Sequence, residues 1–197
     1  NHWPRICAVD FGWTHKTAVV WLAWDRDNDC IHLYDAYGAS EQTPMVHSIA
    51  IKARGDWIPV VWPQDGLQHE KGTGDELKKQ YLKYGVKMHN KPSTNPPDHE
   101  AGQKEGEGGN SVEVGITEIN ERILTGRFKV AKHLNDWFEE FRLYHRKDGK
   151  IVKLNDDFMD ATRYGVMMIR HAKVPAPQRR KVMPGFNVTD SATGVLG

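Results

Sequence analysis

Apolar residues gather in short runs along the first part of the chain, and these runs predict strands. Arg5 to Asp10 is an apolar stretch that ends in an acid, which is typical of a buried central strand. Runs rich in β-branched and aromatic residues follow from Thr17 to Trp24 and from Cys30 to Tyr37. Because the connections between the three runs are short, the pattern predicts an antiparallel meander.

A helix and a fourth strand are predicted next. Thr43 to Arg54 begins with a threonine that can cap a helix and has Pro44 at the first helical position, with Met45 and Ile49 along one face. Trp57 to Trp62 is again β-branched and aromatic, which predicts a strand. A strand that follows a helix after a meander predicts a parallel crossover onto the same sheet.

The rest of the chain predicts mainly helices around one long loop. Residues 90–110 contain three prolines and no apolar periodicity, so we expect a long mobile loop there. Helices are predicted at Asp75 to Lys83, Ser111 to Leu124, His133 to Arg146 and Asp156 to His171. Short extended segments are expected at Val86 to His89 and Arg127 to Val130, and a turn at Lys147 to Lys150.

The last two helices have apolar faces that should be buried. The first of them places four residues at i, i+3, i+4 and i+7, namely Leu134, Trp137, Phe138 and Phe141. The core face of the final helix is predicted to hold Phe158, Ala161, Gly165, Met168 and Ile169.

Length and composition indicate one globular domain. The chain has 197 residues, of which 39% are hydrophobic and 27% charged. We predict a domain over residues 1–174 and a flexible basic tail over residues 175–197, where proline, glycine and polar residues replace the apolar pattern. The sequence begins with Asn1 and enters a predicted strand almost at once, so we expect it to be part of a longer chain. It contains no P-loop motif.

The two cysteines and the absence of long apolar stretches indicate in which cellular compartment the protein works. Cys7 and Cys30 both lie in apolar runs, which favours buried, reduced thiols over a disulfide. No stretch reaches the roughly 18 apolar residues of a membrane span, and no signal peptide is recognisable. These features favour a cytosolic protein. The net charge of +1 does not decide whether the chain binds nucleic acid, because the distribution of charge matters more than its sum.

Acidic residues recur at the ends of the predicted elements. Asp10 closes the first strand, Asp65 follows the fourth strand, and Asp157 and Asp160 lie in the first turn of the final helix. If the first and fourth strands are neighbours, Asp10 and Asp65 leave the sheet at the same edge. Taken singly, each residue has another interpretation, since aspartates commonly form turns or occupy the first turn of a helix. Asp156 is assigned to the N-cap of the final helix.

Carboxylates grouped at one edge predict a metal site. Like charges a few ångströms apart raise one another's pKa values unless cations neutralise them. Mg²⁺ and Mn²⁺ prefer carboxylate oxygens, and two such ions about 4 Å apart can clamp a scissile phosphodiester. The pattern therefore predicts two-metal phosphodiester hydrolysis, with Asp160 ranked slightly above Asp157 as the third ligand beside Asp10 and Asp65.

The order of these elements resembles the nuclease domain of the large terminases of tailed phages, especially those of the headful-packaging type. The strongest match is Asp156-Asp157-Phe158-Met159-Asp160-Ala161-Thr162-Arg163-Tyr164, while Asp10-Phe11-Gly12 and Asp65-Gly66 are individually weak. The resemblance covers roughly residues 5 to 172. It implies an RNase H-like α/β fold, with a mixed central sheet of antiparallel meander and parallel strands flanked by helices.

The resemblance also implies an activity, a site and partners. The activity is metal-dependent cleavage of duplex viral DNA concatemers during genome packaging. Asp10, Asp65, Asp157 and Asp160 are implied as catalytic metal ligands for Mg²⁺ or Mn²⁺. Implied partners are double-stranded DNA, an ATPase domain earlier in the same full-length chain, the portal protein and the small terminase subunit. Such a protein acts in the host cell cytoplasm, transiently on the procapsid.

Basic residues that could contact phosphates lie in three segments. Residues 71–91 contain six lysines, residues 127–153 contain eight basic residues against four acids, and residues 170–181 contain five basic residues and no acid. The turn from Lys147 to Lys150 is predicted to be a DNA-contacting hairpin near the acidic edge. Lysines on helices can also be merely solvated, and the tail could be a docking peptide for the portal or could bind nothing in particular.

Three other functions are considered. Another RNase H-like enzyme, such as a junction resolvase or a transposase core, would share the metal site. An actin-like ATPase is suggested by Asp10-x-Gly12 with Thr14 or Thr17, although the sequence holds no second phosphate loop. A docking module whose acids bind no metal would show no metal-dependent thermal shift.

Overall fold

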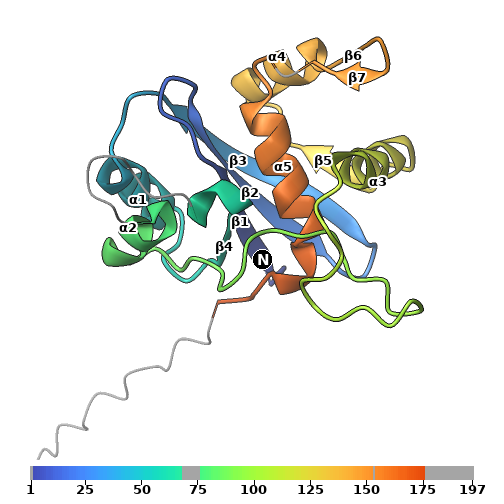
Figure 1. The fold of residues 1–197 in the computed structure, drawn as a ribbon, viewed down its shortest axis with the longest axis horizontal. Helices are drawn as coiled ribbons and strands as arrows, with labels where there is room; N and C mark the ends of the chain where they lie inside the picture. Colours follow the sequence, from blue (N-terminus) through green and yellow to red (C-terminus); the bar gives the residue numbers. More distant parts are fainter. Residues whose placement is uncertain (1, 68–75, 153, 176–197) are drawn as a thin grey trace, which may run out of the picture.

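A five-stranded mixed sheet forms the centre of the molecule (Figure 1), a computed structural model that describes residues 2–67, 76–152 and 154–175. The strand order is β4-β1-β2-β3-β5. Strands β1, β2 and β3 form an antiparallel meander, while β4 is parallel to β1 and β5 is parallel to β3. The strands span Arg5–Asp10 (β1), Thr17–Asp25 (β2), Cys30–Ala39 (β3), Val60–Val61 (β4) and Phe128–Val130 (β5). The predicted meander and the parallel crossover are both confirmed.

Helices cover both faces of this sheet (Figure 1). One face is covered by α1 (Pro44–Ala53) and α2 (Leu77–Lys83). The other is covered by α3 (Val112–Leu124), α4 (Asn135–Leu143) and α5 (Asp157–Met167). Two 3-10 helices, η1 (Gln64–Leu67) and η2 (Ile169–His171), follow β4 and α5, and a small hairpin of β6 (Arg146–Lys147) and β7 (Lys150–Ile151) joins α4 to α5.

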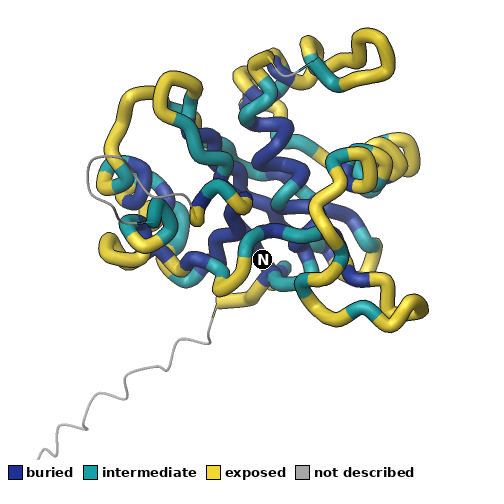
Figure 2. The backbone as a smooth tube through the Cα atoms, in the orientation of Figure 1, coloured by how far each residue is buried: buried dark blue, intermediate teal, exposed yellow. Residues whose placement is uncertain are grey.

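Alternate residues of the central strands enter two separate cores. Ile6, Ala8 and Leu22 pack with α5 and α4, whereas Cys7 and Val9 pack with α1 and α2 on the opposite face. The interior of β1 is therefore buried on both faces, which explains why its sequence is continuously apolar rather than alternating. Figure 2 shows the buried strands enclosed between more exposed helices.

The buried face of α1 differs from the predicted one. Met45 and Ile49 are 47% and 61% exposed, whereas His47, Ser48 and Ile51 are buried. The apolar spacing of Met45 and Ile49 was therefore misleading. The polar side chain of His47 is accepted in the core because its Nδ1 lies 3.2 Å from the Tyr37 hydroxyl. Pro44 occupies the first turn as predicted, but the threonine before it makes no side-chain capping hydrogen bond.

Two predicted strands are shorter than their sequences suggested. The strand predicted at Trp57 to Trp62 is reduced to Val60–Val61, because the preceding residues form a turn in which the Ile58 N–H donates to the Gly55 carbonyl. The segment predicted at Val86 to His89 makes only one isolated parallel bridge, between Met88 and Val60. Both segments nevertheless lie at the β4 edge of the sheet.

Several helices begin or end at other residues than predicted. The predicted helix from His133 to Arg146 is α4 alone, and its Phe141 is 40% exposed although its ring stacks on that of Trp137. The predicted final helix divides at Met168 into α5 and η2. Residues 90–110 contain no helix or strand, and the turn at Lys147 to Lys150 joins β6 to β7, both as predicted. Asp75 and the tail beyond residue 175 lie outside the described residues.

The cysteines and the helix lengths agree with the sequence. Cys7 and Cys30 are buried and form no disulfide. Among the described residues, no helix combines the length and apolar character that a membrane crossing requires.

Candidate metal centre

The parallel pairing of β1 with β4 brings two of the predicted acids to one edge of the sheet. Asp10 is the last residue of β1, and Asp65 lies in η1, directly after β4. The helix α5 crosses the same sheet at close range, because a Cβ on Gly165 would lie 2.5 Å from Leu22 and 3.2 Å from Ala8. The helix thus lies against β1 and β2 (Figure 1), and its first turn carries Asp157 and Asp160.

The four predicted acids are close enough to influence one another's protonation. Burial raises the pKa of Asp10 well above its usual value, and the charges of Asp160, Asp65, Asp157 and Asp156 raise it further, in that order. A carboxyl group that is buried among other carboxylates disfavours its own negative charge. Asp65, Asp157 and Asp160 therefore lie near enough to Asp10 for their charges to act on it, while the role of the four acids as metal ligands stays a prediction.

Asp65 presents an oxygen that the rest of the site leaves without a hydrogen bond. Its Oδ1 is buried and has no hydrogen-bond partner among the described residues. Burial raises the pKa of Asp65, the Gly66 N–H lowers it, and the charge of Asp160 raises it. A buried carboxylate oxygen normally has a partner, so this one is available to a ligand.

Asp157 lies at the side of the cluster that faces the loop between β1 and β2. Burial raises its pKa, while the positive charges of Lys16 and His15 on that loop lower it. The loop therefore approaches the first turn of α5. The charge of Asp157 is thus partly balanced by cations from another element.

Asp160 forms an ion pair with an arginine one turn further along α5. Arg163 Nη2 lies 3.0 Å from Asp160 Oδ1, and both side chains are nearly buried. The guanidinium group also lies over the ring of Tyr164, 4.5 Å from its centre. Burial and then the charges of Asp10 and Asp160 raise the pKa of Tyr164, so its hydroxyl borders the acid cluster.

The neighbouring helix α3 makes room for this arginine. A Cβ on Gly115 would lie 2.5 Å from Arg163 Cγ, which is closer than a side chain can approach. The glycine therefore allows the guanidinium to reach Asp160 from beneath α3.

Glu140 on α4 holds the first turn of α5, a role that the sequence did not indicate. Its side chain is buried, and Oε2 accepts the Phe158 N–H at 2.7 Å. Its Oε1 accepts a hydrogen bond from Lys16 Nζ at 2.6 Å. The prediction that Asp156 caps this helix is wrong in one respect, because Asp156 occupies the N-cap position but makes no side-chain capping hydrogen bond. A glutamate three residues after the buried Trp137 was the available signal, since that spacing places it on the inner face of α4.

The donor atoms of the cluster fit a hard divalent cation. Within residues 2–67, 76–152 and 154–175, no three Asp, Glu, His or Cys side chains are close enough together to hold a metal ion as they stand. The predicted ligands are all carboxylates, which suit Mg²⁺ and Mn²⁺, and Asp65 Oδ1 has no competing hydrogen bond. The residues therefore fit the predicted metal in kind.

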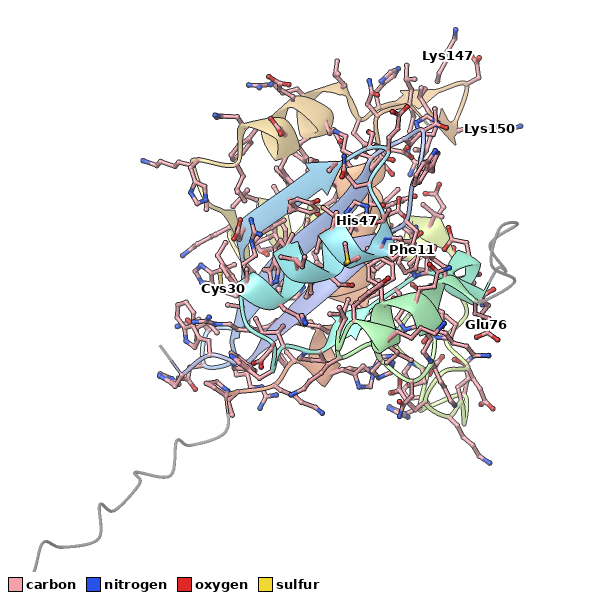
Figure 3. All side chains as sticks on the ribbon, turned by 90° about the vertical axis from the view of Figure 1, so that its left-hand side faces the viewer. Phe11, Cys30, His47, Glu76, Lys147 and Lys150 are labelled. Atoms are coloured by element: carbon pink, nitrogen blue, oxygen red, sulfur yellow. The ribbon has the colours of Figure 1, made fainter. Side chains whose placement is uncertain are left out.

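The hairpin of β6 and β7 lies at the same end of the molecule as the acids. Burial and the charge of Asp160 raise the pKa of Tyr144 to about 12, which places the base of the hairpin near the cluster. Lys147 and Lys150 are exposed and project outward from the hairpin (Figure 3).

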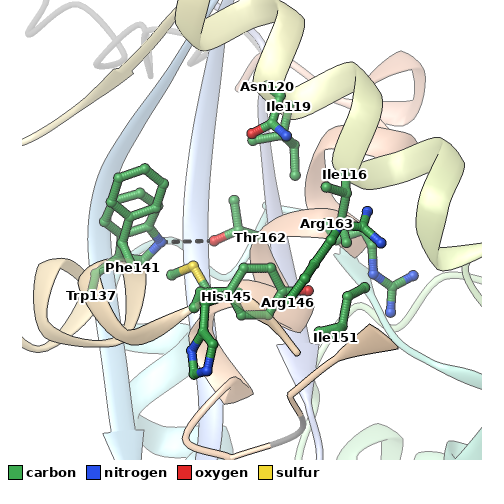
Figure 4. A pocket seen from close by; sticks show the side chains of 12 residues that line it. Ile116, Ile119, Asn120, Trp137, Phe141, His145, Arg146, Ile151, Thr162 and Arg163 are labelled. Carbon is green, nitrogen blue, oxygen red and sulfur yellow. Dashed lines mark hydrogen bonds between the residues drawn. The ribbon is translucent and has the colours of Figure 1, made fainter. Parts of the chain in front are cut away.

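A cavity of about 240 Å³ lies beneath this hairpin, between α3, α4 and α5. Its apolar wall includes Ile116, Ile119 and Ile151, and Arg163 forms part of it (Figure 4). On the far side, Trp137 Nε1 donates a hydrogen bond of 2.9 Å to Thr162 Oγ1, which ties α4 to α5.

Comparison with known proteins gives consistent matches. A family model described as the terminase RNaseH-like domain matches residues 7–169. The terminase large subunit of Salmonella phage P22 is 46% identical over 187 residues, covering 92% of this chain and 36% of that protein. The solved nuclease domain of the P22 large terminase is 48% identical with a TM-score of 0.77, covering 88% of this chain and 84% of that domain.

A more distant likeness concerns the fold alone. The nuclease domain of g2p, the large terminase of bacteriophage SPP1, was solved with bound Mn. It is 14% identical with a TM-score of 0.57, and the match covers 86% of each chain. Together with the nearer matches, this likeness confirms the predicted RNase H-like α/β fold.

The matches cover most of this chain but only part of its longer relatives. The chain spans about a third of the length of the curated relatives that it matches. The family match favours the terminase interpretation over the resolvase, transposase and actin-like alternatives.

Proposed function

Because this chain belongs to the family of terminase RNaseH-like domains, we propose that it is an endonuclease that cleaves duplex viral DNA during genome packaging. The observation that carries the proposal is the approach of Asp10, Asp65, Asp157 and Asp160 to one another at one sheet edge, where burial and then the charges of the other acids raise the pKa of Asp10. A resolvase or a transposase core would use acids at the same edge, and the family match supports the terminase nuclease over both.

The proposed cofactor is a pair of Mg²⁺ or Mn²⁺ ions. Asp10, Asp65 and Asp160 would hold them, with Asp157 beside the site. When bound, such ions supply an activated water molecule and neutralise charge at the reacting phosphate. Support comes from the carboxylate donor set and from the unpartnered Oδ1 of Asp65. The related SPP1 nuclease domain was solved with bound Mn, which also supports a divalent metal as the cofactor.

The remaining residues of the site would position these ligands and the DNA. Arg163 fixes one oxygen of Asp160, and Glu140 fixes the turn of α5 that carries Asp157. Lys147 and Lys150 would bind the phosphate backbone, a contact that sets the register of the duplex without reading its sequence.

The proposed partners follow from the longer relatives. The matched relatives are terminase large subunits, and this chain accounts for about a third of them. We propose that the full-length protein carries an ATPase domain and acts with the portal protein and the small terminase subunit. It would do so in the host cell cytoplasm, transiently on the procapsid.

A plasmid cleavage assay tests the proposal. Supercoiled plasmid is incubated with the chain in Mn²⁺, in Mg²⁺ or in EDTA, beside Asp10→Asn and Asp160→Asn. The matched control is Asp56→Asn, an exposed acid before β4, at the opposite end of that strand from the cluster. We expect nicking and linearisation in the presence of metal, lost in the first two variants and kept in the control. Cleavage that persists in EDTA, or in Asp10→Asn, would contradict the metal-dependent mechanism.

A further inference from the structure

Trp13 is a large aromatic side chain that lies exposed next to the acid cluster. It is 59% exposed, on the loop between β1 and β2. Among the described residues, no aromatic ring or cation lies against the indole, and its N–H donates no hydrogen bond. A tryptophan is normally buried for most of its area, whereas this one leaves its indole open to contact with a bound molecule.

The loop that carries Trp13 is held in a defined shape. The Gly12 N–H donates to Thr17 Oγ1 at 3.2 Å, and the same hydroxyl donates to the Gly12 carbonyl at 2.8 Å. The Glu41 N–H donates to the Trp13 carbonyl at 2.9 Å. A Cβ on Gly12 would lie 2.6 Å from the carbonyl oxygen of His15, so only glycine fits this tight turn. The indole is thus presented from a fixed backbone.

The position of the loop places Trp13 close to the phosphate that would be cleaved in the proposed reaction. Trp13 follows Asp10 by three positions in the sequence, so their Cα atoms are at most about 11 Å apart. Duplex DNA rises about 3.4 Å for each base pair, so Trp13 lies within about three base pairs of a phosphate held at the acid edge. Lys16 on the same loop lies 2.6 Å from Glu140 of α4 and 4.9 Å from the centre of the Phe158 ring in α5, so the loop borders the first turn of α5.

We propose that Trp13 contacts a DNA base beside the scissile phosphate and stabilises a locally unstacked conformation of the duplex. This inference rests on the proposed nuclease function. An indole carries no positive charge that could bind a phosphate, whereas every base presents an aromatic face on which tryptophan can stack. Apolar and aromatic side chains that enter a base step also bend the duplex, which would bring its backbone into the recessed carboxylates.

If Trp13 stacks on a base, the enzyme should cleave many sequences but should prefer sites where the duplex is easily deformed. Stacking does not distinguish the four bases strongly, so it imposes no fixed recognition sequence. Pyrimidine–purine steps unstack most easily, so cleavage should favour them when Trp13 is present.

The test compares two DNA substrates and two substitutions. Initial cleavage rates in Mn²⁺ are measured on a fully paired duplex and on the same duplex with a short unpaired bubble. We expect Trp13→Ala to slow cleavage of the paired duplex by about tenfold or more, as for a lost base stack, and to retain most of the rate on the bubble. Trp13→Phe should restore much of the rate on the paired duplex.

A matched control removes another exposed apolar side chain. Leu124 is 86% exposed at the end of α3, whose Arg122 contacts Asp29 in the turn between β2 and β3, at the sheet end away from Asp10. Leu124→Ala should cut both substrates as the unmodified chain does. Suppose that the unmodified chain is active. If Trp13→Ala then cuts the paired duplex normally, or cuts both substrates more slowly by the same factor, the inference is overturned but the proposed function stands. An unmodified chain that cuts neither substrate would count against the proposed function itself, and the inference would fall with it.

Discussion

Glu140 on α4 caps α5 from outside that helix, with its carboxylate 2.7 Å from the backbone nitrogen of Phe158. Helices usually satisfy their first N–H groups with a side chain of their own N-cap residue. Here the acid-bearing turn is fixed instead to a neighbouring helix, and the same carboxylate is paired with Lys16. The placement of Asp157 therefore depends on how α4 packs.

Removing this cap should weaken both the fold and the site. Glu140→Ala leaves the Phe158 N–H and the Lys16 ammonium without their acceptor, which we expect to cost about 1–3 kcal/mol in the free energy of unfolding. Glu140→Gln keeps one acceptor oxygen and should lose less. Urea unfolding measures the first effect, and calorimetric titration of Mn²⁺ measures the second. Unchanged Mn²⁺ affinity in a folded Glu140→Ala variant would show that the cap does not position the ligands.

The ion pair of Arg163 and Asp160 should contribute most to the stability of the fold when no metal is bound. Arg163→Met leaves the nearly buried carboxylate without its arginine partner, and loss of one partner of a buried pair costs about 3 kcal/mol or more. Bound Mn²⁺ can replace the missing positive charge, so the variant should gain more thermal stability from Mn²⁺ than the unmodified chain. The comparison needs melting temperatures with EDTA and with Mn²⁺.

Gly115→Ala provides an independent variant for the same pair. The added methyl group would meet Arg163 Cγ at 2.5 Å and should displace the guanidinium from Asp160 without removing its charge. The two variants should therefore shift the Mn²⁺ response in the same direction. Equal loss of stability in EDTA and in Mn²⁺ would indicate a purely structural role for the arginine.

The raised pKa of Asp10 predicts that an amide at this position stabilises the metal-free domain. Below about pH 3.9, the aspartic acid is protonated in both the folded and the unfolded states, and it has no effect. As pH rises above that value, the unfolded chain releases the proton first, so the free energy of unfolding falls until the folded pKa is passed. Asp10→Asn avoids this loss. In EDTA it should melt at a higher temperature than the unmodified chain at pH 7, and the difference should shrink toward pH 4.

The hairpin lysines should contribute to DNA binding without affecting sequence preference. Lys147 and Lys150 lie directly opposite each other across β6 and β7. Removing one phosphate-binding lysine should reduce the slope of log affinity against log salt by about one. Fluorescence anisotropy with duplexes of several sequences, for Lys147→Ala and Lys150→Ala, measures this slope. Lys52→Ala, on the exposed surface of α1, is the control, and an equal effect there would remove the hairpin from the binding surface.

The sheet and the positions of its acids could be predicted because their causes are local. The apolar run of β1 and the acids that follow β1 and β4 are visible in the sequence, and the parallel crossover follows from general topology. The ion pair of Arg163 with Asp160 could also be predicted, because the two residues are at positions i and i+3 of one helix.

Other features depend on contacts between distant segments and could not be predicted. His47 is buried because Tyr37 and Tyr81, from other elements, surround its ring. Glu140 caps a helix that begins 17 residues later, and Gly115 accommodates an arginine from α5. Such relationships follow from how helices pack, which periodicity along a single segment does not reveal.

The two edges of the sheet in the described chain are formed by strands of only two and three residues, β4 and β5. The outer side of β4 is already occupied, because the Val60 N–H donates to the Lys87 carbonyl and the His89 N–H donates to the Val60 carbonyl. Long bare edges are where folded domains recruit further strands and aggregate. A domain of this design can therefore be concentrated with little tendency to associate through its strands, even though β1 and β2 at its centre are almost wholly apolar.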